Sequence, residues 1–203
     1  MDEKDIRFFL VRHAQSWGNI NSPDAPSYQP DDPPLTPEGL AQAERLAERF
    51  EPGMIEHIYA STLVRTAQTV QPTAEKLGLP ILLLPELREM DTFIPGGSPE
   101  EFARLAPRAV FVPGRDAPPL VGMDAAYTAA RADAALEYIA ASCPDGSSVI
   151  VCAHGSFFGY LIRRLLGIQL PETFCWKVDN CSVTEIQLRK GKIPKLCRAN
   201  SVQ

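Results

Sequence analysis

The hydrophobic residues of the chain follow two alternating patterns. Short apolar runs are typical of strands buried on both faces of a sheet, whereas apolar residues at every third or fourth position are typical of one helix face. The runs predict strands at residues 6–11, 57–60, 81–84 and 148–153, and a closing hairpin at residues 180–188 and 193–197. The second pattern predicts helices at residues 36–50, 63–77, 98–105 and 158–165, and an alanine-rich stretch predicts a further helix at residues 124–142.

Residues at the helix ends agree with this assignment. Thr36 followed by Pro37 is a typical helix start, and Ser98 with Glu101 forms a capping-box pattern. Gly78 stands just past a predicted helix, where glycine is favoured. Strands that alternate with helices of this length predict an α/β fold, a three-layer α/β/α sandwich with a mostly parallel central sheet and helices on both faces.

Composition and charge narrow the range of functions. The 203 residues, 45% hydrophobic and 22% charged, predict a single catalytic domain over residues 1–203. The net charge of −5 argues against a general nucleic-acid binder and against an anionic membrane partner. The acidic N-terminus, the absence of a long apolar run and five cysteines without a C-x-x-C pair predict a cytoplasmic protein. The oligomeric state is left open.

Charged and imidazole side chains follow the predicted strands. Ligands of such sheets bind beyond the carboxyl ends of the strands, and there stand Arg12, His13, Arg65, Glu89 and His154. Either histidine alone is as readily an ordinary polar residue that ends a strand. Arg65 lies in a first helical turn, an unfavourable place for a cation unless an anion binds there; the alternatives are a nearby carboxylate or solvent. Together, these residues favour an anion site.

The same residues suit phosphoryl transfer. Two guanidinium groups can each bind a phosphate through two hydrogen bonds. One imidazole can attack phosphorus and form a covalent intermediate, while the second stabilises an equatorial oxygen. The leaving oxygen then needs a proton from a carboxylic acid, for which Glu89 is the candidate because it follows the third strand.

Five segments in order resemble the histidine phosphatase superfamily, the phosphoglycerate-mutase-like proteins. They are LVRHAQSWGN at residues 10–19, LTPEGLAQA at 35–43, YASTLVRTAQT at 59–69, LREMD at 87–91 and VCAHG at 151–155. The likeness extends over about residues 6 to 190. It implies that His13 becomes phosphohistidine and that Arg12, Arg65 and His154 form the phosphate pocket. It also implies that Glu89 is the proton donor, and that Asn19, Ser16 and Gly155 bind phosphate or substrate. The family's catalysis implies no metal and no cofactor.

The resemblance leaves the substrate open. Residues 92–98 depart from the family's usual pattern in a segment that shapes the substrate side of the pocket. The main expectation is a phosphomonoesterase that acts on a small phosphorylated metabolite. The alternative is a phosphoglycerate-mutase-type transfer between positions of a sugar acid, and a third reading is a non-catalytic module that binds a phosphorylated ligand. Mutases carry further basic residues after the acid; here Arg104, Arg108 and Arg115 are expected to be solvated.

Two proline-rich stretches, residues 21–37 and 95–119, are expected to be long loops. Loops of that length inside a compact domain usually serve a function.

Overall fold

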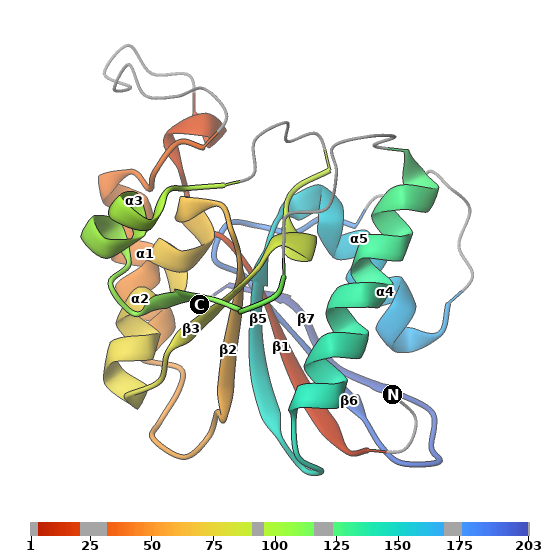
Figure 1. Ribbon diagram of the computed structural model, residues 1–203. Coiled ribbons are helices and arrows are strands. Elements are labelled where there is room, and N and C mark those ends of the chain that lie inside the picture. Colours follow the sequence, from red (N-terminus) through yellow and green to blue (C-terminus); the bar gives the residue numbers. More distant parts are fainter. Residues whose placement is uncertain (1–3, 21–31, 91–95, 116–123, 169–175, 203) are drawn as a thin grey trace.

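The computed structural model describes residues 4–20, 32–90, 96–115, 124–168 and 176–202. Within these ranges seven strands form one sheet with helices on both sides (Figure 1). The strands are β1 (Ile6–Arg12), β2 (His57–Ser61), β3 (Ile81–Leu84), β4 (Ala109–Phe111), β5 (Ser148–Ala153), β6 (Val183–Leu188) and β7 (Lys195–Ser201). The α-helices are α1 (Pro37–Ala47), α2 (Val64–Leu77), α3 (Pro99–Leu105), α4 (Ala125–Ser142) and α5 (Gly155–Leu166), and the 3₁₀ helices are η1 (Trp17–Asn19) and η2 (Pro85–Leu87).

The sheet has the strand order β4-β3-β2-β5-β1-β6-β7. The pairs from β4 to β1 are parallel, and β6 and β7 add two antiparallel strands at one edge. The central strands β1 and β5 are almost fully buried because helices cover both of their faces. This confirms the predicted three-layer α/β/α fold with a mostly parallel sheet.

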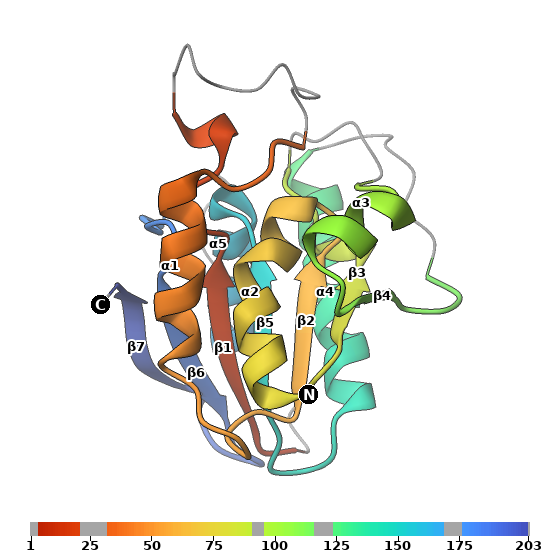
Figure 2. The same ribbon diagram turned by 90° about the vertical axis from the view of Figure 1, so that its left-hand side faces the viewer.

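The helices form two layers. Helices α1, α2 and α3 lie on one face of the sheet, and α4 and α5 lie on the other (Figures 1 and 2). Because neighbouring side chains of a strand point to opposite faces, Phe8 and Leu10 enter the core under α4 and α5, whereas Phe9 and Val11 enter the core under α1 and α2. No helix of the described ranges combines the length and the hydropathy needed to cross a lipid bilayer.

Residues 95–119 were expected to be a long loop apart from the helix at residues 98–105, and the expectation of loop beyond that helix was wrong. Besides the predicted helix α3, this stretch contains β4, which pairs with β3 at the edge of the sheet. The strand is short and Val110 is half exposed, so it lacks the buried apolar run that marked the central strands. Arg115 is also not simply solvated, because it forms an ion pair with Glu86 and its guanidinium lies 4.1 Å from the ring centroid of Tyr138. In the other proline-rich stretch, residues 21–31 lie outside the described residues.

Candidate active site

The parallel register of β1 and β5 brings the two predicted site histidines together. Arg12 of β1 pairs with Ala153 of β5, so His13 and His154 leave the same edge of the sheet side by side. The ring centroids lie 5.3 Å apart, with the ring planes at 54°. The two histidines are 141 positions apart in the chain, and strand pairing alone sets their separation.

Three contacts hold the loop that carries His13. The main-chain N–H of Ala14 donates to Oγ1 of Thr69 at 2.8 Å, and Nδ2 of Asn180 donates to the His13 carbonyl oxygen at 3.0 Å. The first turn of α1 packs directly on the loop, because a Cβ atom at Gly39 would overlap the carbonyl oxygen of Gln15. Only glycine allows this approach, which explains Gly39 in the second of the five segments.

The hydrogen bond of His13 determines its tautomer. Nδ1 lies 2.8 Å from the Ala14 carbonyl oxygen. A carbonyl oxygen only accepts, so Nδ1 is the protonated nitrogen, and in the neutral ring Nε2 carries the lone pair. The side chain is therefore oriented to offer Nε2 as a nucleophile.

His154 lies at the N-terminus of α5 and is fully buried. Neither of its ring nitrogens has a hydrogen-bond partner among the residues that the structure describes. Buried polar groups nearly always have such a partner, and an unsatisfied one costs about 1–3 kcal/mol. Two unsatisfied ring nitrogens next to His13 are unusual for a structural histidine and agree with a site that binds a ligand.

The pKa values of both histidines lie well below the ordinary value of 6.5. Burial is the main cause for each ring, and the positive charge of Arg65 is the next. Both imidazoles are therefore neutral at pH 7, which keeps the lone pair of His13 free. A phosphate dianion in the cavity would raise both pKa values, since it would bring negative charge next to the rings.

These shifts predict a loss of stability at mildly acidic pH. Below pH 6.5 the histidines of the unfolded chain take up protons that the folded chain does not, so the free energy of unfolding falls as the pH falls. Relative to a His154→Gln variant, the wild type should lose about 1 kcal/mol between pH 6.5 and pH 5.5. Denaturant unfolding of both proteins at each pH measures this difference. An equal pH dependence in the two proteins would contradict the lowered pKa of His154.

Arg12 and Arg65 lie close enough to the histidines for their positive charges to lower the pKa of both rings. Arg12 is the last residue of β1, and its Nη1 donates to the Val178 carbonyl oxygen. Its buried Nε has no hydrogen-bond partner within the described part of the chain. Arg65 is in the first turn of α2 and is 8% exposed. Gly155 packs behind Arg12, because a Cβ atom there would lie 3.3 Å from the Arg12 Nε. Whether Gly155 also contacts substrate stays a prediction.

A carboxylate occupies part of the N-terminus of α2. Asp32 accepts a hydrogen bond from the main-chain N–H of Val64 at 2.9 Å, and its other oxygen lies 3.3 Å from Nη1 of Arg65. Burial raises the pKa of Asp32 to about 6, although the Val64 N–H and Arg65 oppose this shift. A nearby carboxylate was one of the expected alternatives for the partner of Arg65, but no sequence pattern singles out Asp32. Asp32 thus orients a guanidinium that also lines the pocket.

Asn19 and Ser16 form a small network at the mouth of the pocket. Oδ1 of Asn19 accepts from the main-chain N–H of Ser16 at 3.0 Å and from Nδ2 of Asn180 at 3.1 Å. Since the oxygen of the amide is engaged, the Nδ2 group of Asn19 is the part that can donate to a ligand. This geometry agrees with the predicted binding role of Asn19, which stays a prediction.

Glu89 follows η2 and faces the N-terminus of α5. Its Oε1 accepts from the main-chain N–H of Met90 at 2.9 Å, and its Oε2 accepts from the N–H of Ser156 at 3.4 Å. The carboxylate reaches the pocket that contains His13 and the two arginines. Glu89 and Asn19 therefore line the same cavity, and the role of Glu89 as a proton donor stays a prediction.

One cavity joins most of the predicted site residues. It measures about 200 Å³ and is lined by Arg12, His13, Ser16, Gly18, Asn19, Pro33, Arg65 and Glu89. His154 lies next to His13, and Gly155 lies behind Arg12. The size and the polar lining suit a small anion.

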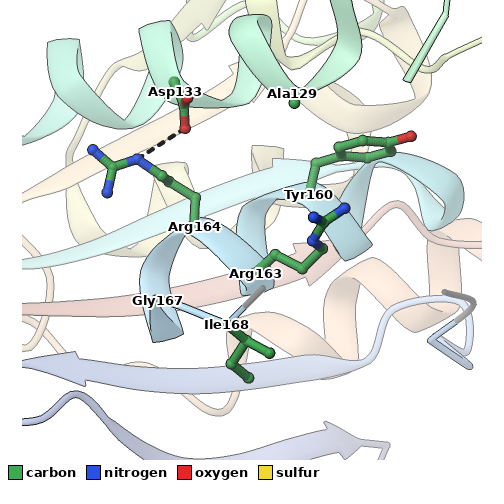
Figure 3. A pocket seen from close by; sticks show the side chains of 7 residues that line it. All are labelled: Ala129, Asp133, Tyr160, Arg163, Arg164, Gly167 and Ile168. Carbon is green, nitrogen blue, oxygen red and sulfur yellow. Dashed lines mark ion pairs between the residues drawn. The ribbon is translucent and has the colours of Figure 1, made fainter. Parts of the chain in front are cut away.

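A larger hollow of about 300 Å³ lies between α4 and α5, away from these residues (Figure 3). Arg164 of α5 crosses it to pair with Asp133 of α4 at 2.8 Å, while Tyr160 and Arg163 line it. The pair is half exposed and is worth at most about 1 kcal/mol. The ion pair links α4 to α5. None of the predicted site residues lines this hollow.

Known proteins resemble this chain over nearly its whole length. The "Probable phosphoglycerate mutase GpmB" of Enterobacter sp. (strain 638) is 30% identical over 196 residues, which cover 92% of this chain and 86% of that protein. Among solved structures, Bacillus stearothermophilus YhfR has a TM-score of 0.71 at 22% identity, covering 98% of each chain. Phosphoserine phosphatase from Entamoeba histolytica, solved with 3-phosphoglyceric acid, has a TM-score of 0.67 at 22% identity, again covering 98% of each chain.

The sequence profile of one family accounts for these likenesses and for the order of the five segments. It matches residues 8–201, from the first buried strand to the last strand of the sheet. The chain belongs to the histidine phosphatase superfamily (branch 1).

Proposed function

We propose that the protein is a phosphomonoesterase that hydrolyses a small phosphorylated metabolite through a phosphohistidine at His13. The observation that supports this most is the cavity in which His13, Arg12 and Arg65 meet, with the ring of His154 5.3 Å from that of His13. Such a cavity fits a tetrahedral dianion, which two guanidiniums neutralise and two imidazoles flank.

In the first step, Nε2 of His13 attacks phosphorus with its lone pair. The N–P bond forms as the ester P–O bond breaks, and the leaving oxygen takes a proton from the carboxyl group of Glu89. The ring becomes cationic, which strengthens the hydrogen bond from Nδ1 to the Ala14 carbonyl oxygen. Arg12, Arg65 and His154 stabilise the charge on the equatorial oxygens.

In the second step, water attacks the phosphohistidine. The Glu89 carboxylate takes a proton from the water as the new O–P bond forms and the N–P bond breaks. Inorganic phosphate leaves, and His13 returns to its neutral state with Nδ1 protonated. No metal enters either step in this proposal.

A mutase is the second candidate, because the curated relatives bear the name "Probable phosphoglycerate mutase GpmB". A mutase must hold a sugar acid with a carboxylate and, transiently, a second phosphate, and this charge calls for additional cations. Among the described residues that line the cavity, Arg12 and Arg65 are the only lysine or arginine residues. We therefore favour the phosphatase, with a substrate that carries little negative charge beyond its phosphate.

The two candidates differ in what they release. We expect the purified protein to release inorganic phosphate from p-nitrophenyl phosphate and from small sugar phosphates, with no bisphosphate and no metal added. Phosphate release and isomer formation from a monophosphoglycerate are measured side by side. Isomerisation without phosphate release, or turnover that starts only with a bisphosphorylated sugar acid, would replace the phosphatase by the mutase.

A further inference from the structure

Arg131 is a buried cation outside the cavity. It lies on α4 and is 5% exposed, and among the buried residues of that helix it is the only charged one. A buried guanidinium is tolerated when hydrogen bonds satisfy it. Within the described ranges, no carboxylate lies within ion-pair distance of Arg131, so its partners must be of another kind.

The guanidinium donates to three main-chain carbonyl oxygens of one turn. Nη1 donates to the carbonyl oxygens of Glu86 at 3.4 Å and Arg88 at 3.0 Å, and Nη2 donates to that of Glu89 at 3.4 Å. This turn follows β3 and carries the Glu89 side chain into the cavity. The guanidinium of Arg131 thus fixes the main chain at three positions: Glu86, Arg88 and Glu89.

Arg131 also contacts the helix on the other side of the Glu89 carboxylate. Its guanidinium lies 5.0 Å from the ring centroid of Phe157, a fully buried residue in the first turn of α5. The same turn contains Ser156, whose main-chain N–H donates to Oε2 of Glu89, and it follows His154 directly. Arg131 therefore links the segment that carries Glu89 to the helix end that carries His154.

We propose that Arg131 is a positioning residue for the reaction: it holds the main chain at Glu89 so that the carboxyl group reaches the leaving oxygen of the substrate. The proposal rests on the proposed function, because it needs Glu89 as the proton donor. Sequence reasoning missed Arg131, since it lies 42 positions from Glu89 in an alanine-rich helix.

The test compares Arg131→Met and Arg131→Lys with the wild type on two substrates. p-Nitrophenyl phosphate has a leaving group that needs little protonation, whereas glycerol phosphate needs the proton. We expect Arg131→Met to lower the rate of phosphohistidine formation, measured in single-turnover experiments, by about tenfold or more with glycerol phosphate and by less than about threefold with p-nitrophenyl phosphate. Arg131→Lys keeps the charge but cannot reach three carbonyls, so it should show the same selectivity with a smaller change in melting temperature.

Two comparisons separate positioning from a purely structural role. In a Glu89→Gln background, Arg131→Met should cause no further loss on glycerol phosphate, because the two residues act through one proton transfer. Arg115→Met is the matched control. Like Arg131, Arg115 contacts Glu86, but it does so through the Glu86 side chain, and it packs on the Tyr138 ring. The substitution should slow both substrates alike or not at all.

The outcomes distinguish the two proposals. Equal slowing of phosphohistidine formation from both substrates by Arg131→Met, or a full additional loss in the Glu89→Gln background, would overturn the role of Arg131 while the wild type remains a phosphatase. A wild type that releases no phosphate from either substrate would overturn the proposed function and this role together.

Discussion

Replacing His13 with alanine is expected to lower kcat for p-nitrophenyl phosphate by at least about 100-fold, since the variant lacks the nucleophile. The folded state should change little, because the ring of His13 contributes one hydrogen bond, to Ala14. The ring is also neutral beside two arginines, so no ion pair is lost with it. We expect the free energy of unfolding to change by no more than about 1 kcal/mol. Steady-state kinetics and denaturant unfolding measure the two quantities.

His57 provides the matched control. It is the first residue of β2, at the end of the sheet opposite to the cavity, and its ring lies beside Tyr59. His57→Ala should keep nearly full activity. An acid-labile ³²P adduct should form on the wild type and on His57→Ala but not on His13→Ala. If His13→Ala keeps more than a tenth of the wild-type kcat, His13 is not the nucleophile. If the wild type forms no adduct and instead binds a phosphorylated protein tightly, the protein is a binding module.

Glu89→Gln should have the second largest effect, and the effect should depend on the leaving group. An alkoxide is a poor leaving group without a proton, so kcat on glycerol phosphate should fall by about 100-fold or more. Nitrophenolate leaves readily without one, so kcat on p-nitrophenyl phosphate should fall much less at the first step. Burst kinetics on p-nitrophenyl phosphate separate phosphohistidine formation from its hydrolysis.

Glu86→Gln is the control for this prediction. Glu86 lies three residues earlier in η2, but its carboxylate pairs with Arg115 and does not line the cavity. The control should leave the ratio of the two rates unchanged. A Glu89→Gln variant that slows both substrates equally at the first step would remove the general-acid role of Glu89.

The central strands, the helices and the grouping of the site were predictable because they depend on local patterns. Buried runs mark β1 and β5, and residues that follow parallel strands gather at one edge of a sheet. This explains why His13 and His154 could be paired from the sequence alone. Strand β4 was missed because an exposed edge strand of three residues has no buried run to mark it.

Asp32 and Arg131 were missed for a different reason. Each acts through partners distant in the chain: Asp32 contacts the first turn of α2, and Arg131 contacts the turn before Glu89. Arg115 was predicted to be solvated because its segment is short and rich in proline, and the sequence does not show that its partner Glu86 lies nearby. Residues that hold a site in place from outside its cavity follow no sequence periodicity. Their contacts can be identified only in the three-dimensional structure.

The alignment of β1 with β5 has a consequence for how this protein tolerates change. Phe9 faces Ile150 across the pair, four residues before the imidazoles emerge. Trimming either side chain removes core contacts but leaves the backbone pairing in place. Adding or deleting one residue in either strand would shift one imidazole along the strand axis and turn it to the other side of the sheet. The number of residues in β1 and in β5 is therefore constrained by the need to keep the two imidazoles together. The identity of the side chains in these strands is constrained mainly by folding.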